Sequence, residues 1–123
     1  MQKSPLSLVL TSGRLRLELV LHLLGQDIQI CLTGGVAHLG AVALALPDRA
    51  AAVLVNPGHR EDALAARMAE TISRTLGCAV CVSAGIHYEA ISKQEITQVE
   101  SMTEELTRQC LALLEAQRST AIC

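Results

Sequence analysis

Three short segments that combine glycine with histidine carry the residues best suited to bind a ligand. They are Thr33 to Gly40 (TGGVAHLG), Pro57 to Arg60 (PGHR) and Ala84 to His87 (AGIH), and they hold three of the four histidines. Glycine lets a backbone approach a ligand closely, and histidine offers a donor that is neutral or cationic near pH 7. We predict that these three corners meet in one binding site.

The segment Gly58-His59-Arg60 has the chemistry of an anion site. It directly precedes an expected helix, whose first turn offers unpaired backbone N–H groups and a partial positive charge. His59 and Arg60 would add charge-assisted hydrogen bonds. A phosphate group would suit this position, although the same residues would equally form an ordinary exposed helix start.

A zinc site is a second interpretation of the same histidines. His38, His59 and His87 together would be enough to ligate one ion and leave a position for water, with Glu61 or Glu89 as a base. However, no pair of histidines has the short spacing of a helical metal motif. A small metal-dependent hydrolase therefore stands as an alternative to a protein that binds a ligand without reacting with it.

Composition limits the class of protein. The 123 residues fit a single domain, 1–123, with a core of about 14–115. Half of the residues are hydrophobic, but Trp and Phe are absent, and the one tyrosine, Tyr88, either stacks on a planar ligand or packs locally. Because the net charge is −2 and there is no basic stripe with stacking aromatics, nucleic acid is not an expected partner.

Two apolar stretches bear on the location of the protein. The run 6–10 is too short for the core of a signal peptide, and glycines and polar residues interrupt the charge-free run 28–47. We expect a cytoplasmic protein that does not span a membrane.

Five cysteines in such a chain predict free thiols, and Cys78 and Cys81 should point to opposite faces of one strand.

Hydrophobic periodicity predicts a sheet. Apolar residues alternate with polar ones from Leu15 to Leu23, which places His22 on the solvated face, and a turn at 25–27 leads into an antiparallel neighbour. The runs 39–46 and 78–83 are apolar throughout, as expected for strands covered on both faces. The expected strands are 15–23, 28–32, 39–46, 51–55 and 78–83, with a weaker candidate, 6–11, at the sheet edge.

Two amphipathic segments predict helices. The first follows Gly58 and ends at Gly77, and the second begins at a capping box, Ser92 to Glu95, and runs to about Glu115, beyond which the tail should fray. The element order is therefore β-β-β-β-α-β-α. We predict an α+β fold, a mixed and mostly antiparallel sheet with two helices packed on it.

The three segments together resemble a known family. The run Gly34 to Ala45, the helix start Gly58 to Glu61, and Ala84 to His87 followed by Ile91-Ser92 and Glu95-Ile96 are similar to the small prenylated-flavin chaperones, a family that includes a small accessory subunit of gallate decarboxylase. The resemblance covers about 15–114. It implies a fold like that of the proteasome assembly chaperones, without implying proteasome work.

The resemblance also implies a function, that of a non-catalytic accessory protein. Such a protein would bind prenylated flavin mononucleotide as cargo and help deliver it to the catalytic subunit of an aromatic-acid decarboxylase. A pure subunit-assembly module without a ligand is a further alternative, and an exposed sheet edge would allow a homodimer. The candidate cofactor-binding residues are Gly34, Gly35, His38, Gly40, Gly58, His59, Gly85 and His87, which match the family motif, and Arg60 from the anion-site argument.

Overall fold

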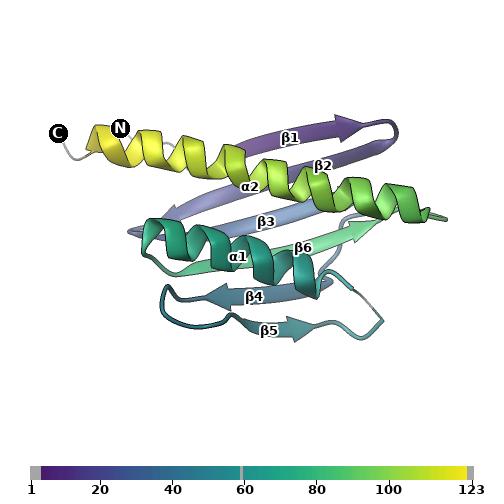
Figure 1. The fold of residues 1–123 in the computed structure, drawn as a ribbon, viewed down its shortest axis with the longest axis horizontal. Helices are drawn as coiled ribbons and strands as arrows, with labels where there is room; N and C mark the ends of the chain where they lie inside the picture. Colours follow the sequence, from purple (N-terminus) through teal and green to yellow (C-terminus); the bar gives the residue numbers. More distant parts are fainter. Residues whose placement is uncertain (1–3, 59, 122–123) are drawn as a thin grey trace.

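The computed structural model describes residues 4–58 and 60–121 as a sheet of six strands with two helices on it (Figure 1). His59, a candidate binding residue, lies outside the described residues. The elements in chain order are β1 (Leu6–Ser12), β2 (Leu15–Leu24), β3 (Asp27–Gly35), β4 (Ala41–Ala45), β5 (Ala52–Val55), α1 (Asp62–Leu76), β6 (Val80–His87) and α2 (Lys93–Ala121).

The strand order across the sheet is β1-β2-β3-β6-β4-β5. Only the β3–β6 pair is parallel, so the predicted α+β fold with a mixed, mostly antiparallel sheet is confirmed. The weaker N-terminal candidate is an edge strand of 7 residues, in which Leu6, Leu8 and Leu10 align with inward leucines of β2. The observed order is thus β-β-β-β-β-α-β-α.

Both helices pack on the same face of the sheet. Helix α1 lies over β4 and β6, and α2 lies over β1 and β2 (Figure 1). The alternation in β2 follows from this arrangement, since Leu15, Leu17, Leu19 and Leu21 are buried under α2. His22 points the other way and is exposed, as predicted.

The expectation that 39–46 and 78–83 are covered on both faces is wrong. Strand β4 buries Ala41 and Ala43 toward α1, but Leu44 is 48% exposed and Leu39, just before the strand, is 64% exposed. In β6, Cys81 and Ser83 on the side away from the helices are only partly buried. Because α1 and α2 share one face, the described chain supplies no layer for the other.

The predicted helix ends are mostly confirmed. Ser92 and Glu95 form the expected capping box, with the Glu95 N–H donating to Ser92 Oγ at 3.0 Å and the Ser92 N–H donating to Glu95 Oε1 at 3.1 Å. Gly77 ends α1 in the left-handed conformation with φ 69°. Within the described part of the chain, neither helix is long and apolar enough to cross a membrane.

The predicted end of the second helix is wrong. Helix α2 continues past Glu115 to Ala121 instead of fraying. The reason is Arg118, whose guanidinium donates hydrogen bonds to Gln26 O at 2.8 Å and to Leu76 O at 3.4 Å. These contacts anchor the last turns of α2 to the β2–β3 turn and to the end of α1.

Candidate functional site

The glycine and histidine segments approach one another at the carboxyl end of β6. Because β6 lies between β3 and β4, residues 36–40 must cross it to connect them. The crossing passes directly over Gly85, where an added Cβ would lie 3.0 Å from the backbone nitrogen of His38. It brings the rings of His38 and His87 to a centroid distance of 6.5 Å.

Glu61 ties the crossing segment to α1. It is the N-cap residue of that helix, and its side chain is only 9% exposed. Its Oε1 lies 3.2 Å from His38 Nε2 and accepts a hydrogen bond from the Ile86 N–H at 3.4 Å, while its Oε2 is buried without a hydrogen-bond partner. Because a buried carboxylate is costly unless donors compensate it, these contacts fix both His38 and the start of α1.

Both ring nitrogens of His38 face acceptors. Nδ1 lies 3.0 Å from Val36 O, and Nε2 faces the Glu61 carboxylate. A neutral imidazole can donate to only one of these groups, whereas an imidazolium can donate to both. The two contacts hold the ring of His38 between the backbone of Val36 and the side chain of Glu61.

Four of the candidate glycines serve the scaffold by leaving room for neighbouring groups. A Cβ at Gly34 would enter the side chain of Leu17, and one at Gly40 would enter the carboxylate of Glu61. Gly35 has φ 65° and packs against the backbone of His87, and Gly85 lies under the crossing segment. These four residues let chain segments approach each other closely.

An open pocket of about 450 Å³ lies between the starts of the two helices and the end of β6. Of the candidate binding residues, Gly58, Arg60 and His87 line it, whereas His38 and the other four glycines do not. Its walls are mostly aliphatic. The described residues that line it are Gly58, Arg60, Glu61, Leu64, Ile86, His87, Ile91, Ile96 and Val99.

The aliphatic walls and Glu61 are the residues that sequence reasoning missed. Ile91 and Ile96 flank the capping box and also belong to the segments that resemble the family, and these were the available signals for them. The sequence presents Glu61 only as a favourable charge at a helix start or as a base. Its pairing with His38, 23 positions earlier, has no periodic signature in the sequence.

Tyr88 packs locally and is not placed to stack on a ligand. Its hydroxyl donates to Arg16 O at 2.8 Å and accepts the Arg16 N–H at 2.6 Å. Arg14 lies over the ring, 5.6 Å from its centroid, and its Nε donates to Glu95 Oε2 at 2.8 Å. This hydrogen bond lowers the pKa of Glu95 to about 2 and holds the first turn of α2, which borders the pocket, and a second one from Arg14 to Glu89 O at 2.9 Å holds the segment before the helix.

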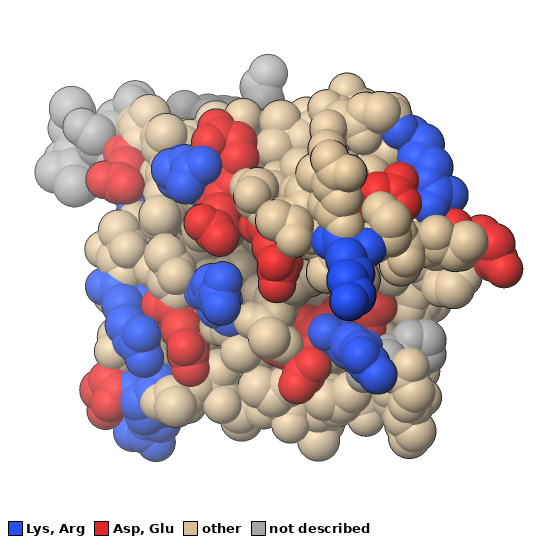
Figure 2. Space-filling model, turned by 45° about the vertical axis from the view of Figure 1, so that its right-hand side comes forward, with Lys and Arg blue, Asp and Glu red and all other residues tan. Residues whose placement is uncertain are grey.

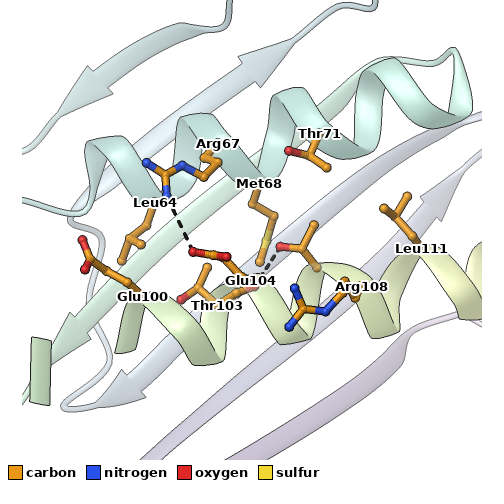
Figure 3. Close-up of a pocket in the computed structure, with 10 residues that line it drawn as sticks. Leu64, Arg67, Met68, Thr71, Glu100, Thr103, Glu104, Arg108 and Leu111 are labelled. Atoms are coloured by element: carbon orange, nitrogen blue, oxygen red, sulfur yellow. Dashed lines mark hydrogen bonds and ion pairs between the residues drawn. The ribbon is translucent and has the colours of Figure 1, made fainter. Parts of the chain in front are cut away.

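A second hollow of about 280 Å³ runs between α1 and α2 on their outer side (Figure 3). Arginine and glutamate side chains place charges of both signs around it, and Arg67 and Glu104 approach to 3.9 Å across it (Figure 3). The hydroxyls of Thr103 and Thr107 donate to carbonyls one turn earlier in α2. They therefore offer a ligand no uncommitted hydroxyl hydrogen.

The two cysteines of the CxxC sequence do not converge. Cys78 is buried just before β6 near Arg118, and Cys81 lies on the face of β6 away from the helices, so the two thiols of the CxxC sequence are separated by the sheet. Burial raises the pKa of the Cys78 thiol. Among residues 4–58 and 60–121, no three His, Cys, Asp or Glu side chains are placed to hold a metal ion.

Comparisons with known proteins identify the family of the chain. The family model for the prenylated flavin chaperone LpdD-like domain matches residues 11–115. The chain belongs to this family. The resemblance inferred from the glycine and histidine segments is thereby confirmed at the level of the family.

Individual relatives give the same result. Protein LpdD of Lactiplantibacillus plantarum (strain ATCC BAA-793 / NCIMB 8826 / WCFS1) is 30% identical over 107 residues, which cover 82% of this chain and 79% of that protein. A chain in the crystal structure of a novel chaperone complex for yeast 20S proteasome assembly matches with a TM-score of 0.63 and 15% identity, over 92% of this chain and 95% of that one. This second likeness shows the fold alone and confirms the expected proteasome-assembly-chaperone-like fold.

Proposed function

We propose that this protein is a non-catalytic accessory protein that binds prenylated flavin mononucleotide in the pocket at the end of β6. It helps deliver this cargo to the catalytic subunit of an aromatic-acid decarboxylase. Membership of the prenylated flavin chaperone family supports the class of cargo. The observation that carries the proposal is the aliphatic pocket with Arg60 and His87 at its mouth.

The pocket fits the two chemical halves of a flavin mononucleotide. Its volume of about 450 Å³ falls within the range of roughly 300–1,000 Å³ that is usual for small-molecule sites. The aliphatic walls would hold the ring system, and Gly58 with Arg60 at the start of α1 would hold the phosphate. The carboxylate of Glu61 does not compete for this position, because its oxygens point to Ile86 N, His38 and Gly40.

The site is also compatible with release of the cargo. Tyr88, the one aromatic side chain apart from the histidines, is committed to the backbone of Arg16, so the ring system would rest on aliphatic groups rather than on a stacked aromatic. Aliphatic contacts without stacking favour moderate affinity. The hydrolase alternative gains no support from the described residues, which place no metal-ligand set.

Titration calorimetry with flavin mononucleotide, its prenylated form and riboflavin tests the phosphate position. Arg60→Ala should weaken binding of the two mononucleotides about tenfold or more, because a charge-assisted hydrogen bond contributes about 1.5–3 kcal/mol. Riboflavin, which lacks the phosphate, should bind both proteins equally. The matched control is Arg67→Ala, which removes an exposed arginine of α1 outside this pocket.

A second pair of variants tests the ring position. Ile96→Glu places a charge in the aliphatic wall and should abolish flavin binding, while Thr97→Glu adds the same charge at the next, exposed position of α2 and should not.

Delivery of the cofactor is tested by adding flavin-loaded protein to a cofactor-free decarboxylase. This addition should restore decarboxylation, and the Ile96→Glu variant should fail to do so. If none of the three flavins binds the unmodified protein, the proposal is wrong, and a stable complex with a decarboxylase subunit would then indicate the assembly module.

A further inference from the structure

Apart from residues 36–40, which cross it at Gly85, one face of the sheet is left bare by the described chain. We call it the far face, meaning the strand side chains that point away from α1 and α2. The register aligns its two central rows across the strands. One row is Ser7, Val20, Cys31, Ser83, Val42 and Leu54, and the next is His22, Gln29, Cys81, Leu44 and Ala52.

The far face lacks the charges of a water-facing sheet. These two rows hold no Lys, Arg, Asp or Glu. Among the described strand residues on this face, formal charges occur only at Arg16 and Asp27, near strand ends, and at Glu18, in the row next to that of Val20. The helix side, by contrast, is dense with acidic and basic side chains (Figure 2). Leu54 is 78% exposed and Leu44 is 48% exposed, so large apolar groups meet solvent on the far face.

The sequence of the central strands is that of strands buried on both sides. Residues 39–46 and 80–86 carry no charge at all, yet both helices cover only one face of them. A domain normally buries such a sheet between two layers. The second layer must therefore come from outside the described chain.

We propose that a second copy of this chain covers the far face, so that two sheets pack against each other about a twofold axis. A two-fold interface requires a surface that complements itself, and a face that is uncharged at its centre meets this requirement without like-charge repulsion. Its side chains are small to medium, which suits sheets packed face to face about 10 Å apart.

The size of the far face suits a stable dimer. Six strands spaced about 4.8 Å apart span about 24 Å, and strands of about seven residues run about 23 Å, which gives roughly 550 Å² in projection. The accessible surface of a corrugated face exceeds its projection. The accessible area of the far face therefore approaches the roughly 800 Å² that each partner of a standard interface buries.

The mass of the protein in solution tests the proposal. Light scattering after gel filtration should give twice the 13.1 kDa of one chain. Cys31→Lys puts a charge at the centre of the far face and should weaken the dimer about a hundredfold or more, because the charge would be buried without a partner. Cys31 is exposed within one chain, so the variant should keep its fold, which circular dichroism checks, and Thr97→Lys on the helix side should stay dimeric.

Alkylation of Cys31, read by mass spectrometry of its peptide, provides a second measurement. In the dimer the Cys31 thiol is covered, so its alkylation should slow at least tenfold as protein concentration rises through the dissociation range. A monomer at all concentrations, or a dimer that survives Cys31→Lys, would overturn the proposal. Protection of Cys31 only after addition of a decarboxylase subunit would overturn it too, because a different protein would then occupy the face.

Discussion

Replacing Gly85 by alanine tests whether the chain crossing over β6 holds the site together. The added methyl group would lie 3.0 Å from His38 N and 2.5 Å from the His38 carbonyl carbon, with the carbonyl oxygen closer still. These atoms belong to the backbone, so no side-chain rotation relieves the overlap. The crossing segment must therefore shift away from β6, which would displace His38 relative to Glu61.

The cost follows from two opposing effects. Overpacking of this kind destabilises by about 3 kcal/mol, and alanine returns about 0.5–1 kcal/mol by restricting the unfolded backbone. A net loss of about 2 kcal/mol remains, equivalent to a fall in melting temperature of about 8 °C for a chain of this length. Loss of the His38–Glu61 contact should also weaken flavin binding, because Glu61 lines the pocket.

Urea unfolding followed by circular dichroism measures this loss. The matched control is Ser83→Ala, two residues earlier on the same face of β6, where a Cβ is already present and the free energy should change by no more than about 0.5 kcal/mol. If Gly85→Ala and Ser83→Ala unfold at the same urea concentration, the crossing segment is not packed on Gly85, and the proposed geometry of the site is refuted.

Three further predictions concern the helices. Because Arg14 lowers the pKa of Glu95 from 4.5 to about 2, this pair stabilises the fold above pH 4.5 and ceases to do so as the pH falls toward 2, so urea unfolding of Glu95→Gln should depend less on pH across that interval. Ser92→Ala removes the N-cap and should cost about 1 kcal/mol by urea unfolding, whereas Ser101→Ala, exposed in mid-helix, should cost nothing; equal losses would contradict the cap. Burial raises the pKa of the Cys110 thiol to about 12, so Cys110 should resist alkylation at pH 8 until denaturant unfolds α2, and rapid labelling of the native protein would contradict its burial.

Much of the fold was predictable because local patterns specify it. The alternation from Leu15 to Leu23 identified the inward face of β2, and the capping box at Ser92 fixed the start of α2. These signals depend on residues close together in the chain. The end of α2 was missed for the same reason, because Arg118 is held by carbonyls that lie 42 and 92 positions away.

The candidate site was less predictable, because its geometry depends on contacts between distant segments. Glycine next to histidine correctly marked the end of β6 as the meeting point of 36–40 and 84–87. It did not distinguish residues that line the pocket, such as Arg60, from glycines such as Gly85 that admit a neighbouring backbone. Spacing alone also gives no account of Glu61, whose burial is visible only once α1 is placed against β6.

The position of β6 between β3 and β4 constrains the order of assembly. Strands β4 and β5 precede β6 in the chain but join the rest of the sheet only through it. During synthesis, β1 to β3 can pair as soon as they emerge, whereas residues 41–55 must wait for residues 80–87, and such long-range pairing is slow. A chain that stops before Val80 would therefore expose the uncharged strands of the β4–β5 hairpin, which makes such truncations of this protein prone to aggregate.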